Sequence, residues 1–314
     1  MTIDWRPSAG AEAIRQRARL LAGMRRFFAE RNVIEVQTPI LTPCGVTDVH
    51  IDSMATRRPE TWLRTSPEYF HKRLLAAGSG DIYELGQVFR RDEAGRFHQP
   101  EFTLLEWYRV GWDWRRLAAE TVDLIRLCLP DNRVDEPVQW RPWRQCFIDD
   151  LGIDGLLAGR DELAALADDA PDGLERDALL DWLFATRIQP ALGARTITVV
   201  YDYPASQAAL ARLRPDDPRV AERFEVFVGA TELANGYREL LAADIQRRRF
   251  ERDNRIRRQR GQPAMPVDEH LLAALAAGMP ECSGVALGVD RLLMLALGAR
   301  AIDEVVSFAR RPGE

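Results

Sequence analysis

Apolar residues recur with helical spacing near the start of the chain and are followed by an extended pattern. Between residues 12 and 31 the apolar positions fall mostly three or four apart, which predicts an amphipathic helix. They are Ile14, Ala18, Leu21, Met24, Phe27 and Phe28. Residues 33–38 then read as a strand, which Pro39 stops because proline has no backbone N–H to donate to a neighbouring strand.

Two short apolar runs separated by a polar turn predict an antiparallel hairpin at residues 82–89 and 102–108. A strand at residues 220–228 and a strand-to-helix pattern at residues 285–296 follow later in the chain. Helices are interspersed without a regular βαβ alternation, so the fold class that we predict is α+β, an antiparallel sheet flanked by helices.

Helical segments broken by Asp, Pro and Gly are predicted at residues 117–129 and 160–192. The second resembles an insertion more than a core element, and we place this helical insertion around residues 155–195. A length of 314 residues permits one large domain or two ordinary ones. Since no repeat, low-complexity tract or flexible linker divides the chain, we predict a single domain over residues 1–314.

Composition narrows the class of protein. With 46% hydrophobic and 29% charged residues and no apolar run of roughly 18, no membrane span is expected. The first residues lack the features of a secretion signal, so we expect a cytoplasmic protein. The four cysteines and four histidines form no ligand cluster, which argues against zinc and against a disulfide framework. A net charge of −5 argues against broad, charge-driven nucleic-acid binding.

One stretch departs from this acidic balance, because residues 244–260 form a strongly basic segment with helical character. Such a run could dock an acidic protein partner or RNA. A solvated helix face is the other interpretation, and it is the one that we favour. The sequence alone does not separate the two.

The polar turn of the predicted hairpin, residues 89–102, concentrates cations, acids and aromatic residues at its ends. A nucleotide phosphate needs fixed positive donors, since arginine contacts to phosphate are charge-assisted and geometrically specific. An adenine ring needs a stacking face and an acceptor for its amino group. Arg90, Phe102 and Asp92 are groups of these kinds, although composition alone would favour a solvated charged hairpin.

Three segments, in the right order along the chain, resemble the signature motifs of class II aminoacyl-tRNA synthetases. Phe-Arg-x-Asp-Glu at residues 89–93, followed by His-x-Pro-Glu-Phe-Thr-x-x-Glu-Trp-Tyr at residues 98–108, is similar to the second motif in its lysyl form. Val-Gln-Thr-Pro at residues 36–39 is similar to the first, dimer-forming motif, and Gly-Val-Ala-Leu-Gly-Val-Asp-Arg-Leu at residues 284–292 to the third. Alone, Pro39 could merely end a strand and Gly288 could merely pack one against a helix. Together the motifs imply the class II synthetase catalytic fold.

Taken over residue by residue, this resemblance implies that ATP is a substrate. Arg90 would hold the α-phosphate, and His98 and Arg291 the pyrophosphate end. Asp92 would read the adenine amino group, and Gly288 would let the nucleotide approach the backbone. Arg90 and Arg291 are the expected catalytic residues. The expected ATP-binding set is Arg90, Arg91, Asp92, His98, Gln99, Phe102, Glu232, Leu233, Gly288 and Arg291. Asp92 and Gln99 depart from the family pattern, which has glutamate and asparagine at these positions.

The resemblance also implies Mg²⁺, held by Glu225 and Glu232. Both lie in residues 224–236, where strand alternation could align oxygen ligands on one face, and Mg²⁺ selects hard oxygen ligands. The other interpretation is that these carboxylates belong to the solvated side of a strand.

A lysine-like substrate has two ammonium groups and one carboxylate, so its pocket should hold acids shielded from water. By the family pattern, Ser66 and Glu68 would bind the amino group near the carboxylate. Glu239 and Tyr108 would bind the distal ammonium, with Glu106 as support. The expected substrate-binding set is Ser66, Pro67, Glu68, Glu106, Tyr108, Asn235, Glu239 and Ala286.

The layout of the motifs distinguishes groups within the synthetases. Lysyl-tRNA synthetases carry an anticodon-binding barrel before the first motif, which here begins near Phe27, so no anticodon-binding domain is expected. The truncated elongation factor P β-lysine ligases share this layout. That resemblance implies activation of (R)-β-lysine with ATP and transfer to a lysine of elongation factor P. The resemblance of the first motif to a dimer-forming one implies a homodimer. Ala286 stands where lysyl-tRNA synthetases usually have glycine, and one methyl group is worth roughly 1–3 kcal/mol of selectivity.

Three alternatives remain at this point. The chain could lysylate tRNA, although its charge and its layout make tRNA a partner that we do not expect. It could be a catalytically silent regulatory paralogue, which the presence of Arg90, Glu232 and Arg291 disfavours. An amide-forming relative such as an asparagine synthetase of this fold would not need acids for a dicationic substrate.

Overall fold

The computed structural model describes residues 5–130 and 133–310, and its centre is an eight-stranded sheet in the order β1-β5-β6-β11-β10-β9-β8-β7. β1 pairs with β5 and β7 with β8 in parallel, and the other neighbours are antiparallel. The strands are β1 (Ile34–Glu35), β5 (Ile82–Phe89), β6 (Glu101–Val110), β7 (Gln139–Pro142), β8 (Ile197–Pro204), β9 (Val220–Val228), β10 (Thr231–Arg238) and β11 (Cys282–Gly288). The predicted α+β class with a mostly antiparallel sheet is confirmed.

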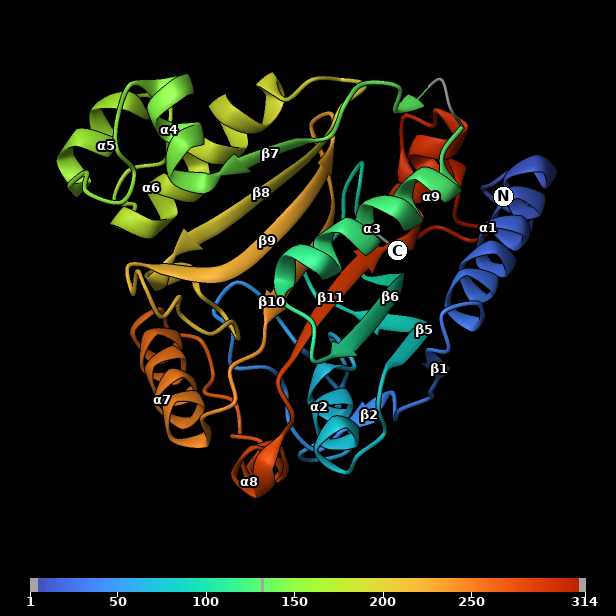
Figure 1. Ribbon diagram of the computed structural model, residues 1–314, viewed down its shortest axis with the longest axis horizontal. Helices are drawn as coiled ribbons and strands as arrows, with labels where there is room; N and C mark the ends of the chain where they lie inside the picture. The colour runs from blue at the N-terminus through green and yellow to red at the C-terminus, as the bar shows by residue number, and fades with distance from the viewer. Residues whose placement is uncertain (1–4, 131–132, 311–314) are drawn as a thin grey trace.

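Three helices cover one face of this sheet: α1 (Ala11–Ala29), α3 (Trp114–Cys128) and α9 (Val289–Leu297) (Figure 1). The largest hydrophobic core lies beneath them. Successive side chains of a strand point to opposite faces, and β6 shows the result. Leu105 and Trp107 are fully buried in this core, whereas Glu106 and Tyr108 line a cavity on the other face.

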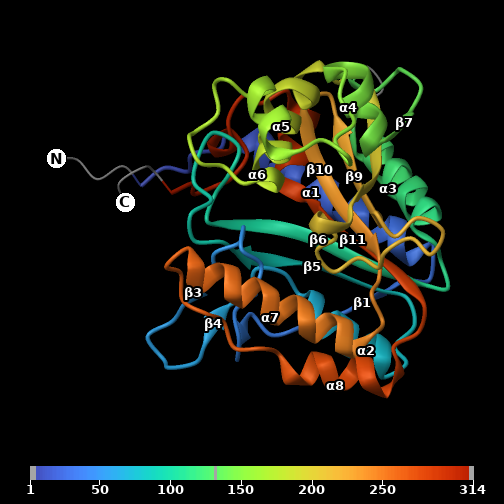
Figure 2. The same ribbon diagram turned by 90° about the vertical axis from the view of Figure 1, so that its left-hand side faces the viewer.

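The other face is covered at its two ends. Next to β8 lie α4 (Trp143–Leu151), α5 (Arg160–Leu166), α6 (Arg176–Leu183) and the π-helical turn η2 (Phe184–Ile188), which share a second core (Figure 1). The 3-10 turn η3 (Gln189–Ala191) follows η2. Helical turns therefore occupy the stretch where an insertion is predicted, and the division into domains stays a prediction. At the opposite end α2 (Glu68–Ala76), α7 (Ala243–Gln259) and α8 (Glu269–Gly278) pack together below β5 and β6 (Figure 2).

Smaller elements complete the described chain. A second sheet has the order β2-β4-β3, formed by β2 (Leu41–Thr42), β3 (Met54–Ala55) and β4 (Trp62–Leu63). The 3-10 turns η4 (Ala205–Gln207) and η5 (Ile302–Glu304) follow β8 and α9. Within the described ranges, no helix has the length and apolar character needed to cross a membrane.

The predicted hairpin is confirmed, since β5 and β6 pair antiparallel from Ile82 opposite Tyr108 to Phe89 opposite Glu101. The strand predicted at residues 33–38 is shorter than expected. Only Ile34–Glu35 form β1, because beyond Val36 the chain leaves the sheet and Thr38 turns inward to donate to Glu84 over 2.7 Å. At this point a hydrogen bond to the Glu84 side chain replaces the backbone hydrogen bonds of a strand.

Candidate active site

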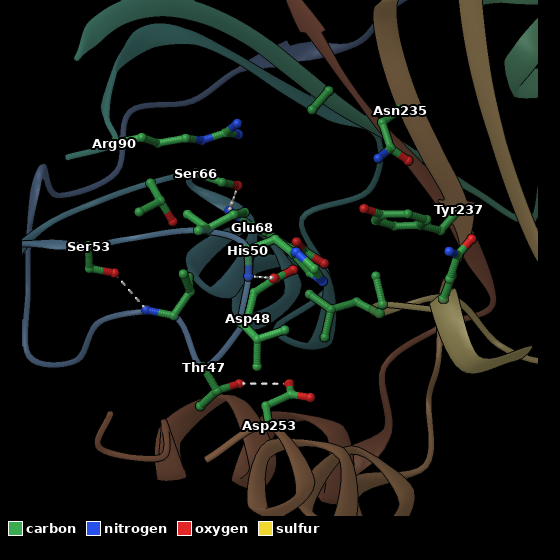
Figure 3. A pocket seen from close by; sticks show the side chains of 18 of the residues that line it. Thr47, Asp48, His50, Ser53, Ser66, Glu68, Arg90, Asn235, Tyr237 and Asp253 are labelled. Carbon is green, nitrogen blue, oxygen red and sulfur yellow. Dashed lines mark hydrogen bonds between the residues drawn. The ribbon is translucent and has the colours of Figure 1, made fainter. Parts of the chain in front are cut away.

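A cavity of about 1160 Å³ lies on the sheet face opposite α3, bounded by β6, β10 and β11 and by residues of α2, α6 and α7. It exceeds the roughly 300–1,000 Å³ that is usual for one small ligand. Figure 3 shows Arg90 and Ser66 on one wall and Asn235 and Tyr237 on the wall facing them. The predicted residues that line it are Ser66, Glu68, Arg90, His98, Gln99, Phe102, Glu106, Tyr108, Glu232, Leu233, Asn235, Glu239, Ala286, Gly288 and Arg291.

Four predicted residues do not line the cavity: Pro67, Arg91, Asp92 and Glu225. Pro67 is the residue before α2, and the guanidinium of Arg91 donates to the Ser53 carbonyl over 3.2 Å. The side chain of Asp92 is exposed, so this arrangement gives no support for its contact with adenine. Its neighbour in the sequence, Glu93, lines the cavity instead.

At one end of the cavity three nitrogen-bearing side chains converge from separate elements. Arg90 follows β5, His98 lies in the hairpin turn, and Arg291 is in the first turn of α9. The Arg291 guanidinium contacts the His98 ring, and burial together with Arg291 lowers the pKa of His98. The buried Nε of Arg90 has no hydrogen bond to any described residue. Donors that face one another in this way fit a bound anion such as a phosphate chain.

Arg90 itself is held by two neighbours. Its Nη1 lies 3.1 Å from Glu93 Oε1, and its guanidinium lies 5.1 Å from the centre of the Phe102 ring. Close by, a Cβ added at Gly288 would meet nothing nearer than 3.9 Å. Protein packing alone therefore does not require glycine at this position, and the backbone there is open to a ligand.

The two carboxylates predicted for Mg²⁺ lie on adjacent strands but differ in exposure. Glu225 on β9 is buried and accepts hydrogen bonds from Tyr203 and Arg223, each over 2.6 Å. Glu232 on β10 faces the cavity, and shelter from bulk water together with the charge of Glu225 raises its pKa to about 7. Within residues 5–130 and 133–310, no three His, Cys, Asp or Glu side chains form a metal cluster. Glu232 thus offers a hard oxygen of the kind that Mg²⁺ binds together with substrate phosphates and water, whereas both oxygens of Glu225 are already hydrogen-bonded.

The other end of the cavity is acidic, and next to its carboxylates lies a buried cation, outside the cavity lining, that the sequence analysis missed. Lys72 on α2 places its Nζ 2.6 Å from Glu68 Oε1 and 2.7 Å from Glu239 Oε2. Burial alone would lower the pKa of Lys72, but Glu239 and Glu68 raise it, so the amine stays charged. Burial raises the pKa of both carboxyl groups, and Lys72 opposes that shift.

Glu106, between these acids and Ser66, has both of its oxygens occupied. Ser66 donates to Oε2 over 2.6 Å, and the Tyr108 hydroxyl donates to Oε1 over 2.9 Å. The ring of His71, also on α2, lies 3.4 Å from Glu106 and 3.1 Å from Glu84. Although burial opposes it, these two carboxylates raise the pKa of His71. Glu106 therefore shapes the pocket through its neighbours rather than through a free oxygen.

A second layer fixes Glu84 behind His71. Arg64, on the segment before α2, places Nη1 2.6 Å from Glu84 and also donates to the Thr38 hydroxyl over 2.8 Å. This layer of Arg64, His71 and Glu84 was not predicted, because each partner is remote in sequence. Lys72 alone had a local signal, since Glu68 and Lys72 have the i, i+4 spacing of a helical ion pair.

Much of the basic helix α7 is already paired. Arg247 lies 2.6 Å from Glu269 and Arg248 lies 2.9 Å from Asp244. Arg257 is buried and donates to the Pro263 carbonyl over 3.0 Å. These contacts account for part of the positive charge of α7.

Comparison with known proteins agrees with this geometry. The family model described as tRNA synthetases class II (D, K and N) matches residues 1–312. Proteins named elongation factor P–(R)-beta-lysine ligase from Proteus mirabilis (strain HI4320) and Histophilus somni (strain 2336) are each 47% identical, over 97% of this chain and 97% of their own. One of the same name from Mannheimia succiniciproducens (strain MBEL55E) is 48% identical over the same shares.

Proposed function

Since the chain belongs to the class II tRNA synthetases (D, K and N), and within them to the family of the elongation factor P–(R)-beta-lysine ligases, we propose that it activates (R)-β-lysine with ATP and transfers it to a lysine side chain of elongation factor P. One observation supports this most directly. A single cavity joins a cluster of phosphate-type donors, Arg90, His98 and Arg291, to buried carboxylates at its other end.

In the first step an oxygen of the substrate carboxylate attacks the α-phosphorus of ATP, and pyrophosphate leaves. Arg90 stabilises the charge that develops on the α-phosphoryl oxygens, while His98 and Arg291 hold the departing end. Glu232, with Glu225 beside it on the adjacent strand, would hold Mg²⁺, and the ion would offset phosphate charge. Positioning and electrostatic stabilisation supply most of the rate, and no covalent enzyme intermediate is needed.

In the second step the ε-amine nitrogen of the acceptor lysine attacks the carbonyl carbon of the β-lysyl adenylate. An amide bond forms, the bond from that carbon to the phosphate oxygen breaks, and AMP leaves. The amine proton can pass to the AMP phosphate, so the chain need not supply a general base.

The amino-acid end favours a dicationic substrate. Glu68 receives the amine near the reacting carboxylate, with Ser66 beside it, and Glu239 receives the distal ammonium. Ala286 lines the cavity opposite Glu106 on β6 and opposite Asn235 on β10. Its methyl group therefore lies where it can influence which lysine isomer fits.

Two further features belong to the same proposal. A homodimer is supported by apolar side chains on and just after α1, where Ile14, Ile34 and Leu41 are 44%, 56% and 55% exposed. Sedimentation at micromolar concentration would test it, and a species with the mass of one chain would contradict it. We also propose that the protein is cytoplasmic. Its four free cysteines support this, because thiols stay reduced in that compartment.

The test of the proposed function is ATP–pyrophosphate exchange with α-lysine and with both β-lysine enantiomers, followed by transfer assays with elongation factor P and with tRNA. We expect exchange to be fastest with (R)-β-lysine, and mass spectrometry to find one added β-lysyl group on elongation factor P. Label recovered on tRNA instead would support the tRNA-lysylating alternative. No exchange with any isomer would support a silent paralogue.

A further inference from the structure

Lys72 connects a helix to the sheet through one ammonium group. Its side chain is 1% exposed, and its Nζ contacts Glu68 on α2 at 2.6 Å and Glu239, just after β10, at 2.7 Å. Because both contacts are made by one small cation, the two carboxylates are held at a fixed separation. A buried charge with two partners is costly to displace, so this separation is rigid.

The sequence sets Lys72 apart from every other cation of the chain. Of the 43 lysine and arginine residues, 42 are arginine, and Lys72 is the single lysine. An arginine presents a planar fork of fixed shape, whereas a lysine presents a compact charge with freely rotating donors. A compact charge can serve two carboxylates that approach from different elements, and the chain uses one here alone.

Each of the two joined carboxylates keeps a second oxygen. Glu239 Oε1 is buried and has no hydrogen-bond partner in the described part of the chain. It lies against Gly284, where an added Cβ would come within 2.6 Å of it. Glu68 lines the cavity, and its Oε2 has no hydrogen bond to another described residue. The oxygens that remain to accept hydrogen bonds from a ligand's amines thus belong to Glu68 and Glu239, the two carboxylates that Lys72 connects.

We infer that Lys72 is a specificity-determining residue, which fixes the distance between the two carboxylates that receive the substrate's ammonium groups. This inference rests on the proposed function and names what selects its substrate. The two amines of β-lysine are separated by four carbon atoms and those of α-lysine by five. A site of fixed spacing distinguishes ligands that differ by one methylene by roughly 10- to 200-fold.

Diamines without a carboxylate test the spacing directly on the unmodified protein. We expect 1,4-diaminobutane, which has the amine spacing of β-lysine, to bind at least about tenfold more tightly than 1,5-diaminopentane in calorimetry. Equal affinities for the two diamines would overturn the inference. Binding of neither would also overturn it, because the two free oxygens would then not be amine acceptors.

Lys72→Met, which keeps the length of the side chain without its charge, tests the cause. With Glu68 and Glu239 no longer joined, the ratio of kcat/KM for β-lysine over α-lysine should fall at least about fivefold, mainly through KM. The control is Asp81→Asn, which breaks the 2.8 Å contact of Asp81 with Arg109 away from the cavity. It should lower the unfolding temperature and leave the ratio unchanged. A folded Lys72→Met protein with an unaltered ratio would contradict the inference.

The outcomes separate this inference from the proposed function. If exchange is faster with (R)-β-lysine than with α-lysine but the two diamines bind with equal affinity, only the role of Lys72 fails. If no lysine isomer supports exchange while the diamines still differ in affinity, the proposed reaction fails and the spacing stands. If Lys72→Met does not fold, the diamine comparison on the unmodified protein decides.

Discussion

The two ends of the cavity hold their charges in opposite ways. At the amino-acid end the cation and its acids are sealed, with Lys72 and Glu239 each 1% exposed and in contact. At the nucleotide end the side chains of Arg90 and Arg291 are 24% and 26% exposed, and Arg291 contacts another nitrogen base, His98. At the first end the cation is paired inside the protein, whereas at the second the two arginines keep contact with water and have one carboxylate each, Glu93 at 3.1 Å from Arg90 and Glu232 at 3.8 Å from Arg291.

Burial explains this difference. A charge withdrawn from water must be paired inside the protein, because an unpaired buried ion costs several kcal/mol. A partly exposed guanidinium is still hydrated and tolerates a missing partner. The amino-acid end can therefore be rigid enough to select a shape, while the nucleotide end offers partly hydrated cations to a polyanionic ligand.

Arg90→Ala should have the largest effect on activity. Removal of a preorganised donor at the reacting phosphate should lower pyrophosphate exchange about 10²- to 10³-fold, with little change in stability. The measurement is the exchange rate at saturating substrate. Arg96→Ala is the control, because Arg96 lies in the same turn but donates to the Arg300 carbonyl over 2.7 Å. A loss of less than about threefold in the Arg90 variant would show that the nucleotide end is wrongly assigned.

Glu239→Gln should weaken substrate binding at the amino-acid end of the cavity. We expect kcat/KM for the lysine substrate to fall about 100-fold, because the change leaves Lys72 with one carboxylate and removes an acceptor for the substrate. The KM for ATP should stay within about twofold. Glu269→Gln serves as the control, since Glu269 pairs with Arg247 on the surface. Equal changes in both KM values would mean that the two ends are not independent.

Glu84→Gln should act on stability rather than directly on binding. Although burial opposes it, hydrogen bonds from His71, Thr38 and Arg64 lower the pKa of Glu84 to about 2. A depressed carboxyl pKa stabilises the fold above the unfolded value near 4.5, and this contribution is lost as pH falls from there toward 2. The variant should lose about 3 kcal/mol at pH 7 in urea unfolding, and its stability should fall less steeply over that window.

The matched control for Glu84 is Glu269→Gln, since Glu269 pairs with Arg247 at the surface at 2.6 Å. It should cost no more than about 1 kcal/mol. If the free energy of unfolding of Glu84→Gln fell as steeply between pH 4.5 and 2 as that of the unmodified protein, Glu84 would not be the group that titrates.

Arg247→Ala on α7 should have the smallest effect. Its ion pair with Glu269 is exposed, so the free energy of unfolding should fall by at most about 0.5 kcal/mol. The rate of pyrophosphate exchange should not change. Transfer to elongation factor P is the sharper measurement. A loss of transfer with intact exchange would show that the basic helix docks the acceptor, contrary to our interpretation of a solvated face.

Local patterns predicted the framework well, because strand and helix periodicities depend on near neighbours. The hairpin of β5 and β6 was predicted to within two residues, and motif resemblance indicated Arg90 and Glu239 as cavity residues. The roles of these two stay predictions. His71, Glu84 and Arg64 were missed because their partners are remote in sequence, and no local pattern reports which buried polar groups meet. Asp92 and Glu93 show the complementary limit, since adjacent residues in a turn differ in which side chain faces the cavity.

The sealed position of Lys72 has one more consequence. An enzyme that holds an activated acyl group for transfer to a lysine amine can acylate its own lysines. This chain has no lysine other than Lys72 that could be acylated. Arginine guanidinium groups stay protonated and do not compete as nucleophiles. Any acyl-lysine found in a mixture of enzyme and acceptor can therefore be attributed to the acceptor.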